Sequence, residues 1–423
     1  MTSSGHLDDA PAAMTDLSPP VDSPVLSRVL CNRLCSGCGG CAALAPGAIR
    51  MELSAEGFLR PLQRGPIDAE TEARIAAICP GVALAQESGT RRDHPLWGPF
   101  LGMYSGHATD PALRHAGASG GALSALLAHL LDTGAVDAVV QVAADPDLPI
   151  GNRIVLSTDR PGVQAGAGSR YAPSAPLEGI GACLESERSY AFVGKPCDVA
   201  ALHAMKRFDD RVGRRFPYLV SFFCAGVPSL DGAREILDQL GVAEKDVTAF
   251  RYRGNGWPGF ATATLDDGSA RKMSYADSWG GVLSRHVQFR CKICPDGTGG
   301  FADVVCADAW ETDEKGYPVF AEREGISLVV SRTEKGEALV RAAVAAQRLA
   351  ISDFDVSTLA GVQPGQTQKR RYTLARLAAL RALGRPAPRY RGFHLLRNAA
   401  RGGMLSNARN FLGTLRRILR GTW

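Results

Sequence analysis

The sequence has no apolar run of about 18 residues or more, which is the least that a helix needs to cross a bilayer. Its start, MTSSGHLDDAPAAMTDLSPP, has acids and prolines where a signal peptide has a basic end followed by an apolar stretch. The first feature argues against a membrane-spanning chain, and the second argues against a secreted one. We therefore expect a cytoplasmic protein.

Acidic residues are absent from the last part of the chain. Residues 369–423 contain 14 Lys and Arg and no Asp or Glu, which leaves 34 basic and 43 acidic residues, a net charge of −9, in the rest. This acidic body argues against nucleic acid as a partner, because it would repel phosphate. The tail LRNAARGGMLSNARNFLGTLRRILRG interleaves apolar and basic side chains, which is typical of contact with an anionic membrane surface or an acidic protein. A lipid contact would place the protein at the inner membrane surface; the alternative is a solvated helical hairpin packed on the body.

The eleven cysteines do not indicate a disulfide framework, because the chain has no signal for export to an oxidising compartment. Clustered cysteines are then better explained as metal ligands or redox groups. Cys35, Cys38 and Cys41 in CSGCGGCAALAP have the spacing of the C-x2-C-x2-C-x3-C-P run of bacterial two-cluster ferredoxins. However, Ala45 precedes Pro46 where that run has its fourth cysteine.

The fourth ligand is expected further along the chain, because the last cysteine of each ferredoxin run ligates the cluster of the other run. A second Cys-Pro pair occurs at residues 79 and 80, and counting back from it by the same spacing gives no cysteine. The positions that would serve the other cluster have all lost cysteine: Ala45, Ala69, Glu72 and Ile75. The pattern predicts one 4Fe-4S cluster on four ligands: Cys35, Cys38, Cys41 and Cys79. Two alternatives stay open, Cys31 as the fourth ligand and zinc in place of the cluster.

A second group of cysteines is spread over the middle of the chain. Cys291 and Cys294 form a CKIC pair, and Cys197 in GKPCD and Cys224 in FFCAG each follow a predicted strand. Sites are usually built from loops at the carboxyl edge of an α/β sheet. We therefore predict a second 4Fe-4S cluster on Cys197, Cys224, Cys291 and Cys294. The alternative for each of the first two is a buried core cysteine. The cysteines expected to have no ligand role are Cys183 and Cys306.

Strand-like and helix-like segments alternate between about residues 101 and 359, which predicts an α/β domain with a mixed sheet. The clearest strands are AVDAVVQVAA, SYAFVG, YLVSFF and ISLVVSR, and the clearest helices are ALSALLAHLL, VAALHAMKRF and KGEALVRAAVAAQ. TATLDDGSARKM, with Asp-Gly at its centre, predicts a β-hairpin. The predicted parts are a disordered lead at 1–25, a small ferredoxin-like cluster domain at 26–90, the α/β domain at 101–360 and a basic helical extension at 368–423.

Loops of small residues predict a site for a phosphate-bearing cofactor. ASGG precedes a predicted helix, whose first N–H groups and dipole attract anions, and GAGSRY and VGKPC add cations for a pyrophosphate. The candidate cofactor-binding residues are Ser119, Gly120, Gly121, Arg170, Gly194 and Lys195. The alternative for the glycines is a tight turn, and the GxGxxG fingerprint of nicotinamide-binding folds is absent.

The segment FRYRGNGWPGF, residues 250–260, is rich in aromatic, glycine and arginine residues. It either covers a planar cofactor or substrate with aromatic and guanidinium planes or is a surface loop with an anchored Trp.

Seven segments follow one another along the chain: CSGCGGC, ASGGALSALL, AGSRYAPS, FVGKPCDVAAL, FFCAG, FRYRGNGWPG and CKICPDGTGGFADVVCADAW. In this order they resemble the coenzyme F420 hydrogenase/dehydrogenase beta subunit family over about residues 30–330. The resemblance implies an iron-sulfur flavoprotein in which electrons pass between 4Fe-4S clusters and FAD. FAD in turn would oxidise or reduce a deazaflavin or another conjugated substrate, and ferredoxin or another redox subunit would be the electron donor. The family also includes ferredoxin-dependent reductases of chlorophyll biosynthesis, from which this sequence departs in its ALAP ending and its basic tail.

Clusters carry single electrons and hydride chemistry moves two, whereas a flavin does both, so this cofactor set suits a junction between them. We expect the first cluster to receive electrons, the second to relay them, and FAD to lie in the α/β domain near Ser119–Gly121 and Lys195. Two other classes of function remain open. One is an electron-transfer subunit that has no substrate of its own and serves a partner through the basic tail. The other is a zinc-stabilised scaffold.

Overall fold

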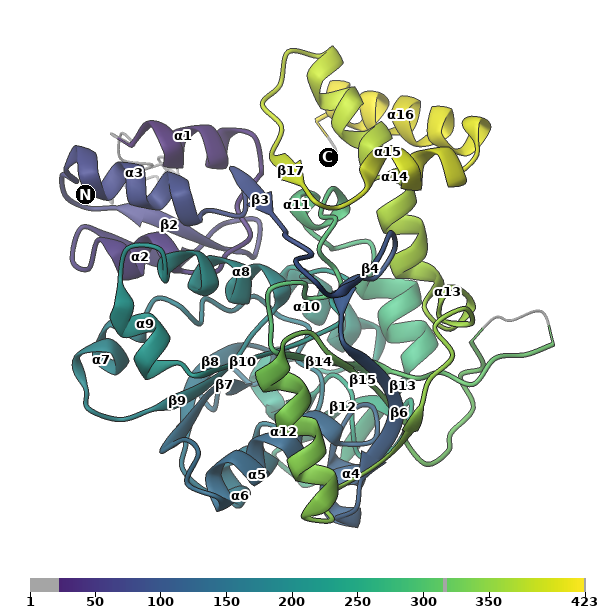
Figure 1. Cartoon of the computed structure of the whole chain (residues 1–423). Helices are drawn as coiled ribbons and strands as arrows, with labels where there is room; N and C mark the ends of the chain where they lie inside the picture. Colours follow the sequence, from purple (N-terminus) through teal and green to yellow (C-terminus); the bar gives the residue numbers. More distant parts are fainter. Residues whose placement is uncertain (1–22, 315–317, 422–423) are drawn as a thin grey trace, which may run out of the picture.

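The structure, a computed structural model, describes residues 23–314 and 318–421 (Figure 1). Of the predicted disordered lead, residues 1–22 lie outside the described residues. Helix α1 (Pro24–Cys31) begins directly after them, and its N-cap Ser23 accepts a hydrogen bond from the Leu26 amide. No helix of the described residues is long and apolar enough to cross a membrane.

Eight strands form the central sheet, in the order β16-β6-β15-β14-β10-β9-β7-β8. Its four inner strands run parallel: β14 (Val304–Asp308), β10 (Tyr218–Phe222), β9 (Tyr190–Val193) and β7 (Ala138–Ala144). The outer strands add in antiparallel pairs: β15 (Ser327–Ser331), β6 (Gly102–Ala108) and β16 (Leu349–Asp353) on one side, β8 (Asn152–Ser157) on the other. The predicted α/β fold with a mixed sheet is confirmed.

Alternating side chains bury both faces of this sheet. In β9, Tyr190 and Phe192 belong to one core, and Ala191 and Val193 belong to the other. The first face is covered by α7 (Ile180–Glu185), α8 (Pro196–Met205) and α9 (Asp210–Arg215). The second is covered by α5 (Ala122–Asp132), α6 (Arg160–Ala165) and α12 (Glu334–Ala345). Each fully buried large side chain contributes about 1.5–3 kcal/mol.

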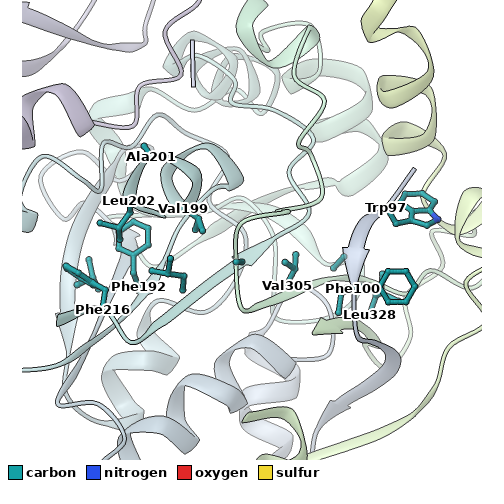
Figure 2. Close-up of a cluster of buried hydrophobic side chains, with 14 of the residues drawn as sticks. Trp97, Phe100, Phe192, Val199, Ala201, Leu202, Phe216, Val305 and Leu328 are labelled. Atoms are coloured by element: carbon teal, nitrogen blue, oxygen red, sulfur yellow. The ribbon is translucent and has the colours of Figure 1, made fainter. Parts of the chain in front are cut away.

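Figure 2 shows the first core, in which side chains from helix α8 meet side chains from the sheet. Val199 and Leu202 lie near Phe192 and Phe216, and Val305 and Leu328 continue the same layer toward Trp97. Because α8 is packed over this layer, its first turn is held at the carboxyl edge of the parallel strands. That edge carries the candidate site.

A second sheet stands beside the first one and is antiparallel. It contains β11 (Val247–Arg251), β12 (Phe260–Leu265) and β13 (Ala270–Ser274). The predicted hairpin joins β12 to β13, and Gly268 takes the positive φ of 79° that the turn requires. Helix α10 (Leu230–Gln239) precedes this sheet; the π-helix η2 (Ala276–Leu283) and the short α11 (Phe289–Lys292) follow it. Ser229 is the N-cap of α10, but its side chain makes no capping hydrogen bond.

The N-terminal unit, residues 23–85, lies apart from the central sheet in Figure 1. After α1 it has α2 (Gly40–Leu44), the antiparallel pair β1 (Ile49–Leu53) and β2 (Leu59–Gln63), α3 (Ala69–Ile78) and β3 (Ala83–Ala85). The short pair β4 (Arg92–His94) and β5 (Gly98–Phe100) then leads into the central sheet.

The C-terminal segment is helical and packs on the rest of the chain. Its elements are α13 (Leu359–Val362), α14 (Pro364–Ala382), β17 (Arg389–Arg391), α15 (Leu395–Arg401) and α16 (Met404–Leu419). Strand β17 pairs in parallel with β3 of the N-terminal unit. Leu377, Leu380 and Ile418 share a buried cluster with Leu34 and Val82. The segment is therefore joined to the N-terminal unit by a strand pair and a common core.

Candidate functional site

The first cysteine quartet, defined as Cys35, Cys38, Cys41 and Cys79, gathers in the N-terminal unit. Its first two members lie in the loop before α2, the third lies in α2, and Cys79 is the C-cap of α3. The loop turns sharply at Gly37 and Gly39, which have φ of 76° and 83°. A side chain at position 39 would bring a Cβ within 2.7 Å of the Glu178 amide nitrogen. Glycine there lets the loop lie against the neighbouring segment.

The four thiols lie within one another's electrostatic field. Burial raises the pKa of Cys38 to about 12, and charge on Asp198, Cys79 and Cys35 adds to the rise. Burial likewise raises the pKa of Cys79 to about 11, with Cys35 as the next cause. Burial also raises the pKa of Cys41, which has the other three thiols around it. Thiols arranged in this way ionise together only if a cation compensates their charge, as a metal cluster does.

Cys31, the alternative fourth ligand, lies elsewhere. It is the last residue of α1 and is exposed. It is not among the main charges that act on Cys38, Cys41 or Cys79. The structure thus brings Cys79, and not Cys31, to the CSGCGGC loop.

The second cysteine quartet, defined as Cys197, Cys224, Cys291 and Cys294, comes from three distant segments and lines one small cavity. Cys197 lies in the first turn of α8, Cys224 follows β10, and the CKIC pair lies in and after α11. Burial raises the pKa of Cys224 to about 12; Lys369 opposes the rise, while Cys291 and Cys294 add to it. Every cysteine that was predicted for the second cluster therefore faces the same space.

A buried arginine lies between the two quartets. The Arg290 side chain is 1% exposed, and its Nη2 donates to the Pro80 carbonyl at 2.7 Å, directly after the first quartet's Cys79. Burial would lower the pKa of Arg290, but nearby groups that include Cys294, Cys197 and Cys291 outweigh it and raise the pKa. The same guanidinium lowers the pKa of Cys79. One cation thus acts on both quartets, which are neighbours.

The C-terminal helix α14 closes the second quartet from another side. Lys369 Nζ donates to the carbonyls of Cys224 and Ala225 at 2.9 and 3.1 Å, and Gln366 Nε2 donates to the Cys224 carbonyl at 3.0 Å. Arg376 Nη1 donates to the Lys292 carbonyl at 2.6 Å. The helix therefore holds the loops that carry the cysteines. None of these residues was identified from the sequence, because their role depends on a contact across about 145 residues of chain.

Within the described residues, no three His, Cys, Asp or Glu side chains stand close enough to hold one metal ion.

A cavity of about 270 Å³ lies at the carboxyl edge of β9, β10 and β14, beside the start of α5. It is called the main cavity here because of this position at the edge of the central sheet. Open α/β sheets usually bind ligands at this edge. Cys224, Gly226 and Val227 line both this cavity and the cavity of the second quartet. A ligand in the main cavity would therefore lie next to the second quartet.

Most of the predicted cofactor-binding residues line the main cavity: Ser119, Gly121, Arg170, Gly194 and Lys195. Gly120 does not line it. It has φ of 79°, and a Cβ there would lie 2.7 Å from the Gly325 carbonyl oxygen, so this glycine serves close packing of two loops. Gly121, with φ of 71°, is the N-cap of α5.

The two predicted cations have other partners in the structure. Lys195 Nζ donates to the Ser174 carbonyl at 3.0 Å and the Ser174 hydroxyl at 2.8 Å, and pairs with Asp198 at 2.8 Å. Arg170 donates to Asn152 and to the carbonyls of Phe250, Pro149 and Gly151. Four of its five N–H groups are thus used within the protein. Both side chains therefore fix the walls of the cavity. Little of the positive charge that was predicted to bind a pyrophosphate is left for a ligand.

An aromatic wall closes one side of the main cavity. The Trp310 ring stacks on Trp257 at 4.8 Å with an interplanar angle of 7°, and Tyr275 lies 5.8 Å from Trp310. The Arg253 guanidinium lies over both cavity-lining rings, 4.6 Å from Tyr275 and 4.8 Å from Trp310. Asp308 accepts from Arg253 at 2.7 and 2.8 Å and from the Trp257 indole at 2.7 Å. Within FRYRGNGWPGF, Trp257 is buried, as expected of an anchored Trp, and Arg253 lines the cavity; that the segment covers a planar ligand stays a prediction.

Several lining residues were missed in the sequence: Tyr275, Trp279, Asp308 and Trp310. The segment CADAW offered a signal, because Asp308 and Trp310 come at the end of a predicted strand, where sites are built. Cys306, predicted to be a core residue, is buried within β14 as expected and also borders the cavity.

Two family models match the chain. The coenzyme F420 hydrogenase/dehydrogenase beta subunit N-terminal model matches residues 103–180, and the C-terminal model of the same subunit matches residues 187–357. The second quartet and the lining of the main cavity, apart from Gln363 and Gln366, lie within these ranges. The first quartet and helices α14 to α16 lie outside them.

Individual proteins agree with these models. The coenzyme F420 hydrogenase subunit beta of Methanococcus voltae is 26% identical over 313 residues, covering 69% of this chain and 99% of its own length. A coenzyme F420-dependent sulfite reductase of Methanocaldococcus jannaschii is 22% identical over 333 residues, covering 75% of this chain and 47% of its own length.

Among solved structures, a chain of the F420-reducing NiFe hydrogenase complex of Methanosarcina barkeri has the same fold. The match has a TM-score of 0.50 at 19% identity and covers 67% of this chain and 96% of that one. Since the two family models together span more than half of the sequence, the chain belongs to the coenzyme F420 hydrogenase/dehydrogenase beta subunit family, a family of oxidoreductase subunits.

Proposed function

We propose that the protein is an iron-sulfur flavoprotein that passes electrons from a donor through two 4Fe-4S clusters to FAD. FAD is bound in the main cavity and serves a deazaflavin or another conjugated substrate. The observation that carries the proposal is the continuity of the sites. Arg290 lies between the two quartets, and Cys224 lines both the second quartet's cavity and the main cavity. Such an arrangement supports a path for electrons through the protein.

The donor sets fit the proposed groups. Each quartet offers four thiols, the ligand type that iron-sulfur clusters prefer. In the main cavity, Trp310 and Tyr275 place aromatic rings in the lining, and Ala122 and Leu123 at the start of α5 line it as well, where helix N–H groups attract anions. When bound, a flavin exchanges two electrons with an organic substrate and single electrons with clusters.

The chain's own residues shape and close this site. Lys195 and Asp198 form a fixed ion pair on the wall of the main cavity, which holds the first turn of α8 and so Cys197 in place. Arg290 supplies positive charge beside two anionic centres. Helix α14 covers the loops of the second quartet through Lys369 and Arg376, which limits the access of water.

The substrate proposal rests on the relatives. Their names refer to coenzyme F420, so a deazaflavin is the first substrate to test. A second candidate function is an electron-transfer subunit without a substrate of its own. It is favoured by the relatives that are named as subunits and by a solved structure that is a hydrogenase complex. In that case a partner subunit, and not ferredoxin, would exchange electrons with the first quartet.

Anaerobic purification followed by assays of iron, acid-labile sulfide and flavin tests the central proposal. We expect about eight iron atoms and one FAD per chain. Reduction with ferredoxin or with reduced coenzyme F420, followed at the flavin absorption band, then separates the two candidate functions. An enzyme that acts on the deazaflavin bleaches with either reductant, whereas a pure electron-transfer subunit bleaches only with a protein donor. A colourless protein without iron would contradict both.

We further propose that helix α16 contacts an anionic membrane surface. Leu405, Leu412 and Leu419 lie seven residues apart on one side of the helix and are 88, 61 and 73% exposed. Arg409 and Arg416 stand exposed between them. The opposite side packs on α14 through Thr414 and Ile418. An exposed apolar stripe next to arginines, in a segment without acids, is typical of helices that lie in a lipid interface.

Flotation with vesicles tests this contact. The protein should float with vesicles that contain phosphatidylglycerol and not with neutral phosphatidylcholine vesicles, and 0.5 M salt should weaken the binding, about 0.5 M being enough to screen surface charge. Leu405→Glu and Leu412→Glu should abolish flotation. Leu156→Glu is the matched control, because Leu156 is 53% exposed on β8, outside the helix. Flotation that survives both helix substitutions would contradict the proposal, as would binding to an acidic protein alone.

A further inference from the structure

Next to the main cavity lies a second one of about 340 Å³, here called the basic cavity. The two share the loop of residues 166–170 as a wall, and Arg253 borders both. We propose that the basic cavity binds the phosphate or carboxylate groups of the ligand whose ring lies in the main cavity. The inference rests on the proposed function in one respect, that the main cavity holds such a ring.

The side chains of the basic cavity have charge of one sign. Its lining contains four cationic residues and no Asp or Glu: Arg170, Arg251, Arg253 and Lys272. Polar groups that can bind an anion accompany them, namely Ser169, Asn255, Thr262 and Thr264. A concave surface with charge of one sign concentrates counter-ions.

Two of these cations are available to a ligand. The Asp308 carboxylate neutralises Arg253, and Arg170 is held by carbonyls. Arg251 donates only through Nη1, to the carbonyls of Ala167 at 3.1 Å and Ala116 at 3.5 Å, and has no acidic partner among the described residues. Burial lowers the pKa of Arg251, with no acid to offset it.

Lys272 is the second available cation. Its ammonium lies 5.9 Å from the centre of the Phe260 ring and makes no salt bridge within the described part of the chain. Lys272 is exposed and Arg251 is half-buried. Both cations can therefore bind an anion without first leaving an acidic partner.

The sheet register aligns the two cations. Arg251 on β11 faces Thr262 on β12, and Thr262 faces Lys272 on β13. The three residues form one row across the sheet, and directly opposed residues project to the same face. Strands lie about 4.8 Å apart, so the outer two backbones are separated by about 10 Å, and their long side chains can converge on one group. The hydroxyl of Thr262 lies between them.

Glycine at position 168 keeps the shared wall thin. Gly168 has φ of 101°, and a Cβ there would lie 2.7 Å from both Arg251 Nη1 and the Arg253 carbonyl oxygen. The loop therefore passes directly over the guanidinium of Arg251. A ligand can then extend from one cavity to the other around a wall of a few small residues.

The chemistry of the site fits a phosphate, a diphosphate or clustered carboxylates on a flexible arm. Such a group has two sources. It is either the diphosphate of the dinucleotide cofactor or the anionic arm of a deazaflavin substrate. Both place a ring in the main cavity and an anion in the basic cavity.

Isothermal titration of the full-length protein with pyrophosphate tests the cavity without flavin or clusters. Arg251→Ala and Lys272→Ala should each weaken pyrophosphate binding roughly tenfold or more, since each removes a charged hydrogen bond. Arg271→Ala is the matched control, because Arg271 precedes Lys272 on β13, points to the other face and does not line the cavity. Unchanged pyrophosphate binding in both cavity variants would overturn the proposal.

Two further arms identify the source of the anion. If it is the cofactor, Arg251→Ala and Lys272→Ala weaken FAD binding and leave riboflavin binding unchanged. If it is the substrate, both variants retain FAD binding, and their KM for coenzyme F420 rises while kcat stays constant. The KM for a deazaflavin without the anionic arm should then be unchanged. A protein that lacks iron and flavin would refute the proposed function, but the pyrophosphate titration would still decide the role of the basic cavity.

Discussion

The two cysteine quartets differ in how the chain builds them. The first takes three cysteines from the loop before α2 and its first turn, and a fourth from 38 residues further on, all within the N-terminal unit. The second collects its cysteines from the first turn of α8, from the loop after β10 and from the segment in and after α11, across almost one hundred residues. Local spacing defines the first site, whereas the edge of the central sheet defines the second. The second is also the one that borders the main cavity.

This difference predicts that losing a ligand has unequal consequences. Cys79→Ser and Cys224→Ser should each lose one cluster, which is about half of the iron and sulfide. Only Cys224→Ser should also shift the flavin absorption band, because Cys224 lines the main cavity. Iron and sulfide assays and a visible spectrum of each variant provide the comparison. Full iron content in Cys79→Ser would mean that the first quartet has another fourth ligand.

The buried pair of Lys195 and Asp198 gives the next largest effect. Asp198 acts on Cys38 of the first quartet and on Cys197 of the second, so its charge must be balanced. Lys195→Met leaves it buried and unpaired, and should lower the free energy of unfolding by about 3–5 kcal/mol. Adding Asp198→Asn should restore part of the loss. Urea titrations of both variants measure this, and a single variant as stable as the double would contradict it.

The same pair predicts a pH dependence. Burial would lower the pKa of Lys195, but the charge of Asp198 outweighs it and raises the pKa from 10.5 to about 12. The folded-state pKa is thus above the unfolded one, so the contribution to stability is complete below pH 10.5 and is lost as the pH rises toward 12. Unfolding curves between pH 9 and 12, roughly the range that brackets these pKa values, should fall more steeply for the wild type than for the double variant.

A smaller effect, shared by the two quartets, is expected at Arg290. Arg290→Met keeps most of the side-chain volume and removes the cation between them. Both clusters should then become harder to reduce, and their midpoint potentials should fall by roughly tens of millivolts. Redox titration followed by electron paramagnetic resonance measures the potentials. Arg271→Met, which removes an exposed cation on β13, is the control. A shift at one cluster alone would show that Arg290 belongs to that site only.

The smallest effect is expected at Cys31. Because it is exposed and lies away from the first quartet, Cys31→Ser should leave the iron content and the cluster spectrum unchanged. Iron analysis beside Cys79→Ser completes the comparison. A loss of iron in Cys31→Ser would reverse the assignment of the fourth ligand.

Much of the fold followed from patterns that operate over a few residues. Short apolar runs predicted β7, β9, β10 and β15, and helical spacing predicted α5, α8 and α12. The tail was predicted as one basic helical extension, 368–423, and the structure separates α15 from α16 at Gly402 and Gly403, where the φ of 76° at Gly403 ends the helical path. Gly413, by contrast, continues within α16, because a single glycine lowers helix stability by only about 1 kcal/mol.

The site was predicted less completely than the fold. Six of the eight cysteines were selected by their spacing, and Cys197 and Cys224 by their place after predicted strands; each quartet gathers in space, and the role of the thiols as cluster ligands stays a prediction. The charges of Lys195 and Arg170 were identified, but their internal partners were not, because Ser174 and the carbonyl of Phe250 approach only in the folded chain. Residues such as Trp310 and Lys369 have no local signature. Their roles come from contacts between distant segments.

The pairing of β17 with β3 has a consequence for biosynthesis. Residues 389–391 lie beside residues 83–85, and Leu377, Leu380 and Ile418 complete the core around Cys35. A ribosome reads these segments last, so the walls around the first quartet are finished only when nearly the whole polypeptide has emerged. Nascent chains shortened before residue 389 would present the CSGCGGC loop to solvent, and insertion of iron and sulfide there is a task for the completed translation product.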